Sequence, residues 1–167
     1  MSRMIEVVQG DICDVGCQYI AHQCNCVTTH AAHLARQIFT KYPYADIYLD
    51  RIYSKIKTIK DLPMDQRPGR IVVSGNGIGQ RYVINMLGQV FPGRPRFITG
   101  MDTEKLREHY FLQCLWRVSR ISGLREVAFP YGIGCGAAGG DWLKYEMSIR
   151  EYADANGDVS VYLVKLR

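Results

Sequence analysis

The chain contains, between two regular segments, the stretch Phe129-Pro130-Tyr131-Gly132-Ile133-Gly134-Cys135-Gly136-Ala137-Ala138-Gly139-Gly140-Asp141-Trp142. Residues 126–130 before the glycines are strand-like, and residues 142–152 after them have the apolar spacing of a helix. Most residues between are Gly or Ala, which let a backbone approach a ligand closely. Successive backbone N–H groups before a helix N-terminus can cradle phosphate. We therefore expect residues 132–139 to hold a phosphate group; the alternative is a tight turn without a ligand.

This glycine stretch does not fit two well-known phosphate loops. Residues 134–139 match G-x-G-x-x-G, the dinucleotide fingerprint, but that motif opens a βαβ unit followed by more sheet. Here only one helix and one strand follow. No Gly-Lys-Ser/Thr sequence closes the stretch, so it is not a Walker A loop. We therefore expect a diphosphate-binding loop of another kind.

Strand-like and helix-like segments alternate along the rest of the chain. β-branched and aromatic runs predict strands at residues 4–8, 19–24, 71–74, 81–87, 126–130 and 159–166, and apolar residues at helical spacing predict helices at residues 31–42, 103–118 and 142–152. The glycines of residues 75–79 predict a hairpin between the third and fourth strands. This order is typical of an α/β fold with a mixed sheet between helices.

The second predicted helix has a candidate cap and a candidate buried stripe. Thr103 precedes this helix and can accept a hydrogen bond from its first turn. The apolar residues that we expect to face the sheet are Leu106, Tyr110, Leu112, Trp116 and Val118.

The composition is that of an ordinary globular protein: 167 residues, 47% of them apolar and 22% charged. A chain of this length can bury a core without disulfides or metal. We expect residues 1–167 to form one domain with no metal or cofactor, and its six cysteines to be reduced thiols.

No apolar run reaches the about 18 residues of a membrane span, and no signal segment opens the chain. We therefore expect a monomeric intracellular protein, cytoplasmic or nuclear, without membrane contact.

The charge balance is mildly basic. The 21 Lys and Arg residues outnumber the 16 Asp and Glu residues, which gives a net charge of +5. This excess favours anionic partners, but the basic residues do not form the clustered patch that indicates nucleic-acid binding. We therefore do not expect nucleic acid as a partner.

The segment His22-Gln23-Cys24-Asn25-Cys26 ends the second predicted strand and is dense in reactive side chains. The cysteine spacings around it are not those of a zinc site, so we expect no metal there. A nucleophilic cysteine would need a third, orienting group, and the segment supplies none. For His22 two interpretations stay open, a hydrogen-bonded core histidine and a functional one.

Several motifs together resemble a macro domain: Gly10-Asp11-Ile12, residues 22–25, residues 82–86, and the glycine stretch 129–142. The resemblance runs nearly from end to end. It is strongest to the branch that contains ADP-ribose 1''-phosphate phosphatases and terminal ADP-ribose protein glycohydrolases. It implies a three-layer α/β/α fold with ADP-ribose in a cleft above the sheet.

The resemblance also implies roles for single residues. Asp11 would accept a hydrogen bond from the adenine amino group, with the backbone of Ile12 beside it, and Tyr162 would pack against adenine. Asn25 would face the distal ribose. The diphosphate would lie on Gly132, Ile133, Gly134, Cys135, Gly136, Ala137, Ala138 and Gly139.

The chain departs from the family pattern in the segment after Asn25. Members of the family carry a glycine-rich loop there, whereas this chain has residues 27–34, Val-Thr-Thr-His-Ala-Ala-His-Leu. We expect an altered distal ribose pocket. Thr28, His30 or His33 either contributes a donor to a terminal phosphate or narrows the cleft.

Two further departures concern catalysis. The glycohydrolases use a lysine near the fourth strand, where this chain has Asn85-Met86-Leu87. They also carry an aspartate early in the glycine loop, where this chain has Ala137-Ala138. We therefore do not expect lysine-dependent covalent chemistry.

The resemblance implies that the chain binds ADP-ribose and removes the phosphate of ADP-ribose 1''-phosphate. His22 and Asp141 are the candidate acid and base, because histidine titrates near neutrality and a carboxylate can orient it. Asn25 completes the candidate catalytic set at the distal ribose. The alternatives are hydrolysis of O-acyl-ADP-ribose or of mono-ADP-ribosylated protein, a reader without turnover, and an RNA-binding module. The expected partners are ADP-ribose, its derivatives and ADP-ribosylated protein.

Overall fold

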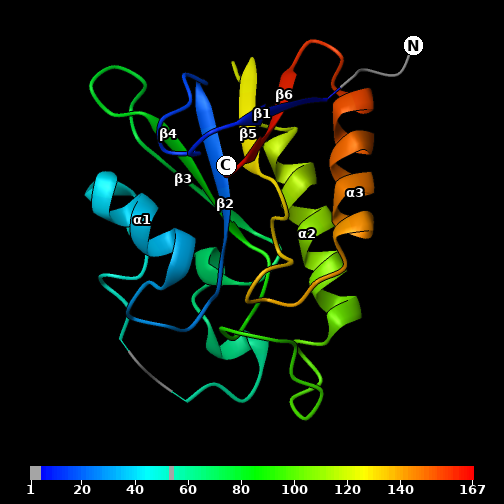
Figure 1. Cartoon of the computed structure of the whole chain (residues 1–167). Helices are drawn as coiled ribbons and strands as arrows, with labels where there is room; N and C mark the ends of the chain where they lie inside the picture. Colours follow the sequence, from blue (N-terminus) through cyan, green and yellow to red (C-terminus); the bar gives the residue numbers. More distant parts are fainter. Residues whose placement is uncertain (1–4, 53–54) are drawn as a thin grey trace.

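A six-stranded sheet forms the middle of the protein, and the computed structural model describes residues 5–52 and 55–167 (Figure 1). The strands are β1 Glu6–Gln9, β2 Tyr19–Cys24, β3 Ile71–Ser74, β4 Tyr82–Leu87, β5 Glu126–Pro130 and β6 Ser160–Lys165. The helices are α1 His33–Lys41, α2 Glu104–Val118 and α3 Trp142–Ala155, with short 3-10 turns η1 Pro43–Ala45, η2 Ile59–Asp61 and η3 Met64–Gln66.

The strand order across the sheet is β1-β6-β5-β2-β4-β3. All neighbouring pairs are parallel except β3 and β4, which are antiparallel with Val72 opposite Asn85. The β3–β4 turn requires glycine at Gly75, where φ is +102° and an added Cβ would lie 2.3 Å from the carbonyl oxygen of Arg81. The predicted hairpin and the predicted mixed sheet are therefore confirmed.

Side chains alternate between the two faces of the sheet, as the period of a strand requires. Along β2, Tyr19 and Ala21 join the core under α2 and α3, whereas Ile20 and Cys24 join the core under α1. Figure 1 shows α2 and α3 on one side of the sheet and α1 on the other. The fold is the predicted three-layer α/β/α arrangement.

The predicted buried stripe of α2 is partly wrong. Tyr110 and Val118 are buried, but Leu112 is 46% exposed and Trp116 is 60% exposed. Each residue turns about 100° around a helix axis, so Leu112 points away from the face of Tyr110. The buried face is instead made by Tyr110, Phe111, Cys114, Leu115 and Val118.

The ends of the helices agree closely with the sequence patterns. The hydroxyl of Thr103 caps α2, because its oxygen accepts a hydrogen bond from the Leu106 N–H at 3.2 Å. Helix α1 begins later than predicted, at His33, and α3 extends further, to Ala155.

The sheet has a switch point between β2 and β5. After β2 the chain crosses one face of the sheet as α1 and returns as β3 and β4, and β4 pairs with β2 on the side away from β5. After β5 the chain crosses the other face as α3 and returns as β6, which pairs with β5 on the side away from β2. The two connections therefore diverge at the carboxyl ends of two paired strands. In open α/β sheets such a divergence leaves a crevice in which ligands bind.

A buried ion pair holds both sides of this crevice. Asp102 and Arg107 are 0% and 2% exposed, and their side chains meet at 2.6 Å. Both oxygens of Asp102 accept backbone N–H groups, from Val90 and Phe91. Arg107 also donates to the carbonyl oxygens of Phe91, Gly93, Arg94 and Ala138. The pair thus joins the segment after β4 to the glycine loop after β5.

Replacing Arg107 by Met should destabilise the protein by about 3–5 kcal/mol, because Asp102 would stay buried without its cation. The free energy of unfolding is measured by urea denaturation. The matched control is Arg125→Met, which breaks the exposed Arg125–Asp158 pair and should cost less than about 1 kcal/mol. Equal losses in the two variants would contradict the role given to the buried pair.

Candidate functional site

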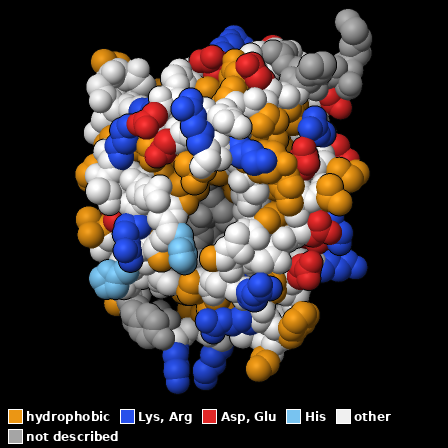
Figure 2. Space-filling view, in the orientation of Figure 1, with side chains coloured by type: hydrophobic (Ala, Val, Ile, Leu, Met, Phe, Trp, Pro, Cys, Tyr) orange, Lys and Arg blue, Asp and Glu red, His pale blue; other side chains and the backbone are white. Residues whose placement is uncertain are grey.

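A cavity of about 500 Å³ lies at the switch point of the sheet. Figure 2 shows this face of the molecule hollowed near its middle, with a histidine at the edge of the hollow. Three parts of the chain form the walls: the segment after β2 with the start of α1, the segment after β4, and the loop after β5. The lining residues are Gln23, Asn25, Thr28, His30, Ala32, His33, Leu34, Ala35, Tyr48, Gln89, Pro92, Gly93 and residues 130–138.

The glycine loop forms one wall and leaves several backbone N–H groups free. Its own turns use the N–H groups of Ile133, Cys135, Gly139 and Gly140. Within the described parts of the chain, no acceptor meets the N–H groups of Gly132, Gly134, Gly136, Ala137 and Ala138. The last three are consecutive, and a run of free N–H groups is a binding site for an anion.

Glycine is required at Gly134 for two reasons. Its φ is +77°, in the left-handed region, and an added Cβ would lie 2.5 Å from the ring of Tyr145. Tyr145 belongs to α3 and is only 2% exposed, so its ring has little room to move away. Gly136 differs, because nothing lies within 4 Å of an added Cβ there.

Asn25 lines the cavity with an amide whose N–H₂ group is not used within the described residues. Its Oδ1 accepts three hydrogen bonds, from the N–H groups of Val27 and Thr28 and from the Thr28 hydroxyl, at 2.9–3.0 Å. These donors fix which end of the amide is oxygen. Nδ2 meets no acceptor within residues 5–52 and 55–167, although Asn25 is only 8% exposed. The site therefore holds a preoriented donor for a ligand oxygen.

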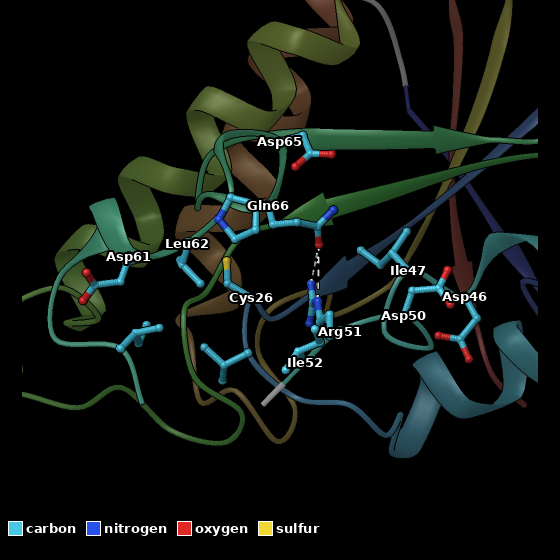
Figure 3. Close-up of a pocket in the computed structure, with 13 residues that line it drawn as sticks. Cys26, Asp46, Ile47, Asp50, Arg51, Ile52, Asp61, Leu62, Asp65 and Gln66 are labelled. Atoms are coloured by element: carbon cyan, nitrogen blue, oxygen red, sulfur yellow. Dashed lines mark hydrogen bonds between the residues drawn. The ribbon is translucent and has the colours of Figure 1, made fainter. Parts of the chain in front are cut away.

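Arg51 supports this segment from behind. Its guanidinium donates to the carbonyl oxygens of Asn25 and Thr28 at 2.9 and 3.1 Å, and it lies 4.3 Å from the ring centre of Tyr48. Figure 3 shows its hydrogen bonds to the amide oxygen of Gln66. Every nitrogen of Arg51 is engaged, so this cation stabilises the loop rather than offering itself to a ligand.

A second hollow, of about 640 Å³, lies beside Arg51 (Figure 3). Its polar lining is mainly acidic, from Asp46, Asp50, Asp61 and Asp65. Carboxylates repel phosphate, and Arg51 is already engaged. The cavity at the switch point is therefore the better candidate site for an anionic ligand.

Comparison with known proteins gives one relative by sequence and many by structure. No protein-family model matches the chain. The protein TV0719 of Thermoplasma volcanium, described as uncharacterized, is 26% identical over 129 residues, 77% of this chain; the match spans 63% of that protein.

Among solved structures, the macrodomain of Thermus aquaticus DarG has a TM-score of 0.69 at 23% identity, over 96% of this chain and 97% of that one. The macrodomain of Mycobacterium tuberculosis DarG has a TM-score of 0.69 at 21% identity, over 97% of both chains. The Trypanosoma brucei macrodomain, solved in complex with ADP-ribose, has a TM-score of 0.62 at 14% identity, over 97% of this chain and 63% of that one.

The chain has the macrodomain fold. Each of these structures is similar to it over nearly its whole length, and the layers and the mixed sheet agree. Within this fold the glycine loop and Asn25, both predicted as site residues, lie together on the cavity. The other predicted site residues lie outside the cavity lining: His22, Asp141, Asp11, Ile12, Tyr162 and Gly139.

His22 lies outside the cavity of this macrodomain fold, on the face of the sheet that α1 covers. It is 1% exposed, and its ring packs edge-on against Phe39 at 5.2 Å. Its Nε2 lies 2.6 Å from Oδ1 of Asn85, whose Nδ2 donates to the carbonyl oxygen of Val72. Burial lowers the pKa of His22 to about 4. The position is that of a hydrogen-bonded core histidine and does not suit the predicted exchange of protons with a ligand.

Asp141 serves as the N-cap of α3. Its Oδ1 accepts a hydrogen bond from the Leu143 N–H at 3.1 Å, and the residue is exposed outside the cavity lining. The role of Asp141 as acid or base stays a prediction.

The residues predicted to contact adenine lie outside the cavity lining. Asp11 follows β1, where its Oδ1 accepts the Cys13 N–H at 2.8 Å, and Ile12 is buried. Tyr162 belongs to β6 and packs partly buried against the core under α1. Gly139 also lies outside the lining, close to the side chain of Arg94. Their ligand contacts stay predictions.

Two glutamines of the cavity were not among the predicted site residues. Gln23 donates to Oε1 of Gln89 at 2.7 Å, and Gln89 donates to the carbonyl oxygen of Phe91 at 2.8 Å. Oε1 of Gln23 is buried and meets no hydrogen-bond donor among the described residues. The signal in the sequence was the position of Gln89 directly after β4, near the expected family lysine. An amide there offers hydrogen bonds but no amine nucleophile.

The cysteine of the glycine loop is held as a thiol. Burial, with a smaller effect of Asp141, raises the pKa of Cys135 to about 12. Its Sγ donates to the carbonyl oxygen of Ile133. Over the described residues, no three His, Cys, Asp or Glu side chains are arranged to hold a metal ion, and no helix is long and apolar enough to span a membrane.

Acid should destabilise the protein through His22. The ordinary pKa of histidine is 6.5, and the folded value is about 4. As the pH falls through this interval, the unfolded chain takes up a proton that the folded protein excludes, so a contribution of about 3 kcal/mol present above pH 6.5 is lost towards pH 4. Urea denaturation of His22→Gln should show a flatter pH dependence than the wild type. Parallel curves would refute this assignment.

Gly134→Ala should destabilise the protein by about 2–4 kcal/mol, through the left-handed backbone and the collision with Tyr145. Gly136→Ala is the matched control in the same loop and should change the free energy of unfolding by less than about 1 kcal/mol. Thermal unfolding of both variants measures the difference. Similar melting temperatures would mean that the loop is not constrained at Gly134.

Proposed function

We propose that the chain binds ADP-ribose in the cavity at the switch point and hydrolyses the phosphate ester of ADP-ribose 1''-phosphate. One observation carries the proposal. The consecutive free N–H groups of Gly136, Ala137 and Ala138 share a cavity with the free amide of Asn25. The first group of donors suits a diphosphate, and the second suits an oxygen of a sugar or of its phosphate.

The order of the strands supports a long ligand of this kind. Along the carboxyl edge of the sheet, Asp11 after β1 comes first, the glycine loop after β5 is next, and Asn25 after β2 follows. Tyr162 lies within β6, the strand between β1 and β5. Adenine, diphosphate and distal ribose follow one another in the same order in ADP-ribose. The T. brucei macrodomain of similar fold was solved with ADP-ribose, which also supports this ligand.

The site suits hydrolysis by a water molecule. Fixed N–H donors can neutralise the phosphate oxygens while water attacks phosphorus, and such preoriented donors need no rearrangement during the reaction. Among the described residues that line the cavity there is no Lys, Asp or Glu. A covalent path through a lysine amine therefore has no residue to perform it.

A reader without turnover is the second candidate function. It is favoured by the positions of the two predicted catalytic groups, since His22 is buried and Asp141 caps a helix. Calorimetric titration with ADP-ribose, followed by product analysis with ADP-ribose 1''-phosphate and O-acetyl-ADP-ribose, separates the candidates. Phosphate release supports the proposal, acetate release alone indicates an ester hydrolase, binding alone indicates a reader, and no binding overturns the proposal.

Asn25→Asp should weaken ADP-ribose binding by about 10- to 100-fold. The carboxylate can still accept the three hydrogen bonds that hold the loop, but it replaces the free donor by a negative charge. The matched control is Asn76→Asp, in an exposed turn where Oδ1 also accepts backbone N–H groups. Calorimetry gives both dissociation constants. An unchanged value for Asn25→Asp would remove Asn25 from the binding site.

A further inference from the structure

The proposed hydrolysis needs a group that moves a proton, and the cavity offers few. Among the described lining residues, the side chains that can ionise are His30, His33, Tyr48, Tyr131 and Cys135. Phenols and thiols hold their protons near neutral pH, and imidazole is the side chain that exchanges one there. Burial also keeps Tyr48 and Cys135 protonated by raising the pKa of each. The choice is therefore between two histidines.

His33 differs from His30 in how its position is determined. It is the first residue of α1, whose later residues Ile38 and Phe39 are buried against the sheet. Its φ is +53°, and within residues 5–52 and 55–167 no other non-glycine residue has a positive φ. A side chain in this strained region persists when the surrounding structure holds it there, and such residues gather at functional sites. His30 lies in the loop before the helix.

The neighbourhood of His33 on the same wall suits a reaction at the distal end of the ligand. Leu34 and Ala35, which follow it in α1, also line the cavity, as does Asn25 at the end of β2. A histidine on a helix is placed more reproducibly than one on a loop. His33 thus places an imidazole at the start of α1, on the same cavity as the amide proposed to face the distal ribose.

We propose that His33 is the catalytic residue that transfers the proton in this hydrolysis, an inference that rests on the proposed function. Water attacks phosphorus and gives one proton to the neutral imidazole of His33. The bond between phosphorus and the 1''-oxygen breaks, and the same proton passes to that oxygen. The products are ADP-ribose and hydrogen phosphate, which keeps the second proton of the water, and His33 is neutral again.

The test uses two variants that keep the backbone. Glycine and asparagine both tolerate positive φ, so His33→Gly and His33→Asn should melt at or above the wild-type temperature. Both should lower kcat for ADP-ribose 1''-phosphate by at least about 100-fold. The dissociation constant for ADP-ribose, which lacks the reacting phosphate, should stay at the wild-type value. Added imidazole should restore part of the kcat of His33→Gly.

The matched control is His109→Asn, which removes an exposed imidazole from α2, outside the cavity lining, and should leave kcat near the wild-type value. His30→Asn removes the other imidazole of the cavity and should lower kcat less than His33→Asn does. Wild-type turnover in both His33 variants would overturn the proposal, and so would a loss confined to His30→Asn. A wild-type chain that binds ADP-ribose and releases no phosphate would instead refute the proposed hydrolysis, and with it any catalytic role of His33.

Discussion

The ion pair between Asp102 and Arg107 connects the two loops on which the cavity depends. Neither the segment after β4 nor the glycine loop after β5 has regular secondary structure of its own near the site. Arg107 donates to the carbonyl oxygens of Gly93 in the first and Ala138 in the second. Charges buried this deeply must stay paired and hydrogen-bonded. Because Gly93 and Ala138 both line the cavity, the pair links two of its walls.

The proposed site presents dipoles rather than charges to an anion. Its donors are backbone N–H groups and the amide of Asn25, and the described lining has no Lys or Arg. Arg51 and Arg107 lie behind the walls, where their donors are occupied by carbonyl oxygens. Oriented dipoles in a confined site can stabilise phosphate without the mobility of a long charged side chain. Because the described lining also has no Asp or Glu, we assign proton transfer to a histidine.

Much of this site could be predicted from the sequence because its signals are local. A run of small residues between a strand and a helix indicates a loop that a ligand can approach, whatever the rest of the chain does. Asn25 follows a strand directly, at the edge where such folds place ligands. His22, by contrast, could not be assigned. A strand pattern shows that His22 and Gln23 point to opposite faces, but not which face α1 covers.

Contacts between distant parts of the chain could likewise not be predicted from the sequence. The glutamine pair of the cavity joins Gln23 to Gln89, 66 residues apart. The left-handed backbone of His33, with φ at +53°, has no signal in the sequence either. By itself the sequence determined the strands, the hairpin, the helices and the chemistry of the glycine loop, since backbone geometry and side-chain size act over a few residues. Only the tertiary structure decided which N–H groups stay free, which histidine is buried and which lines the cavity, because those properties arise when strands remote in sequence become neighbours.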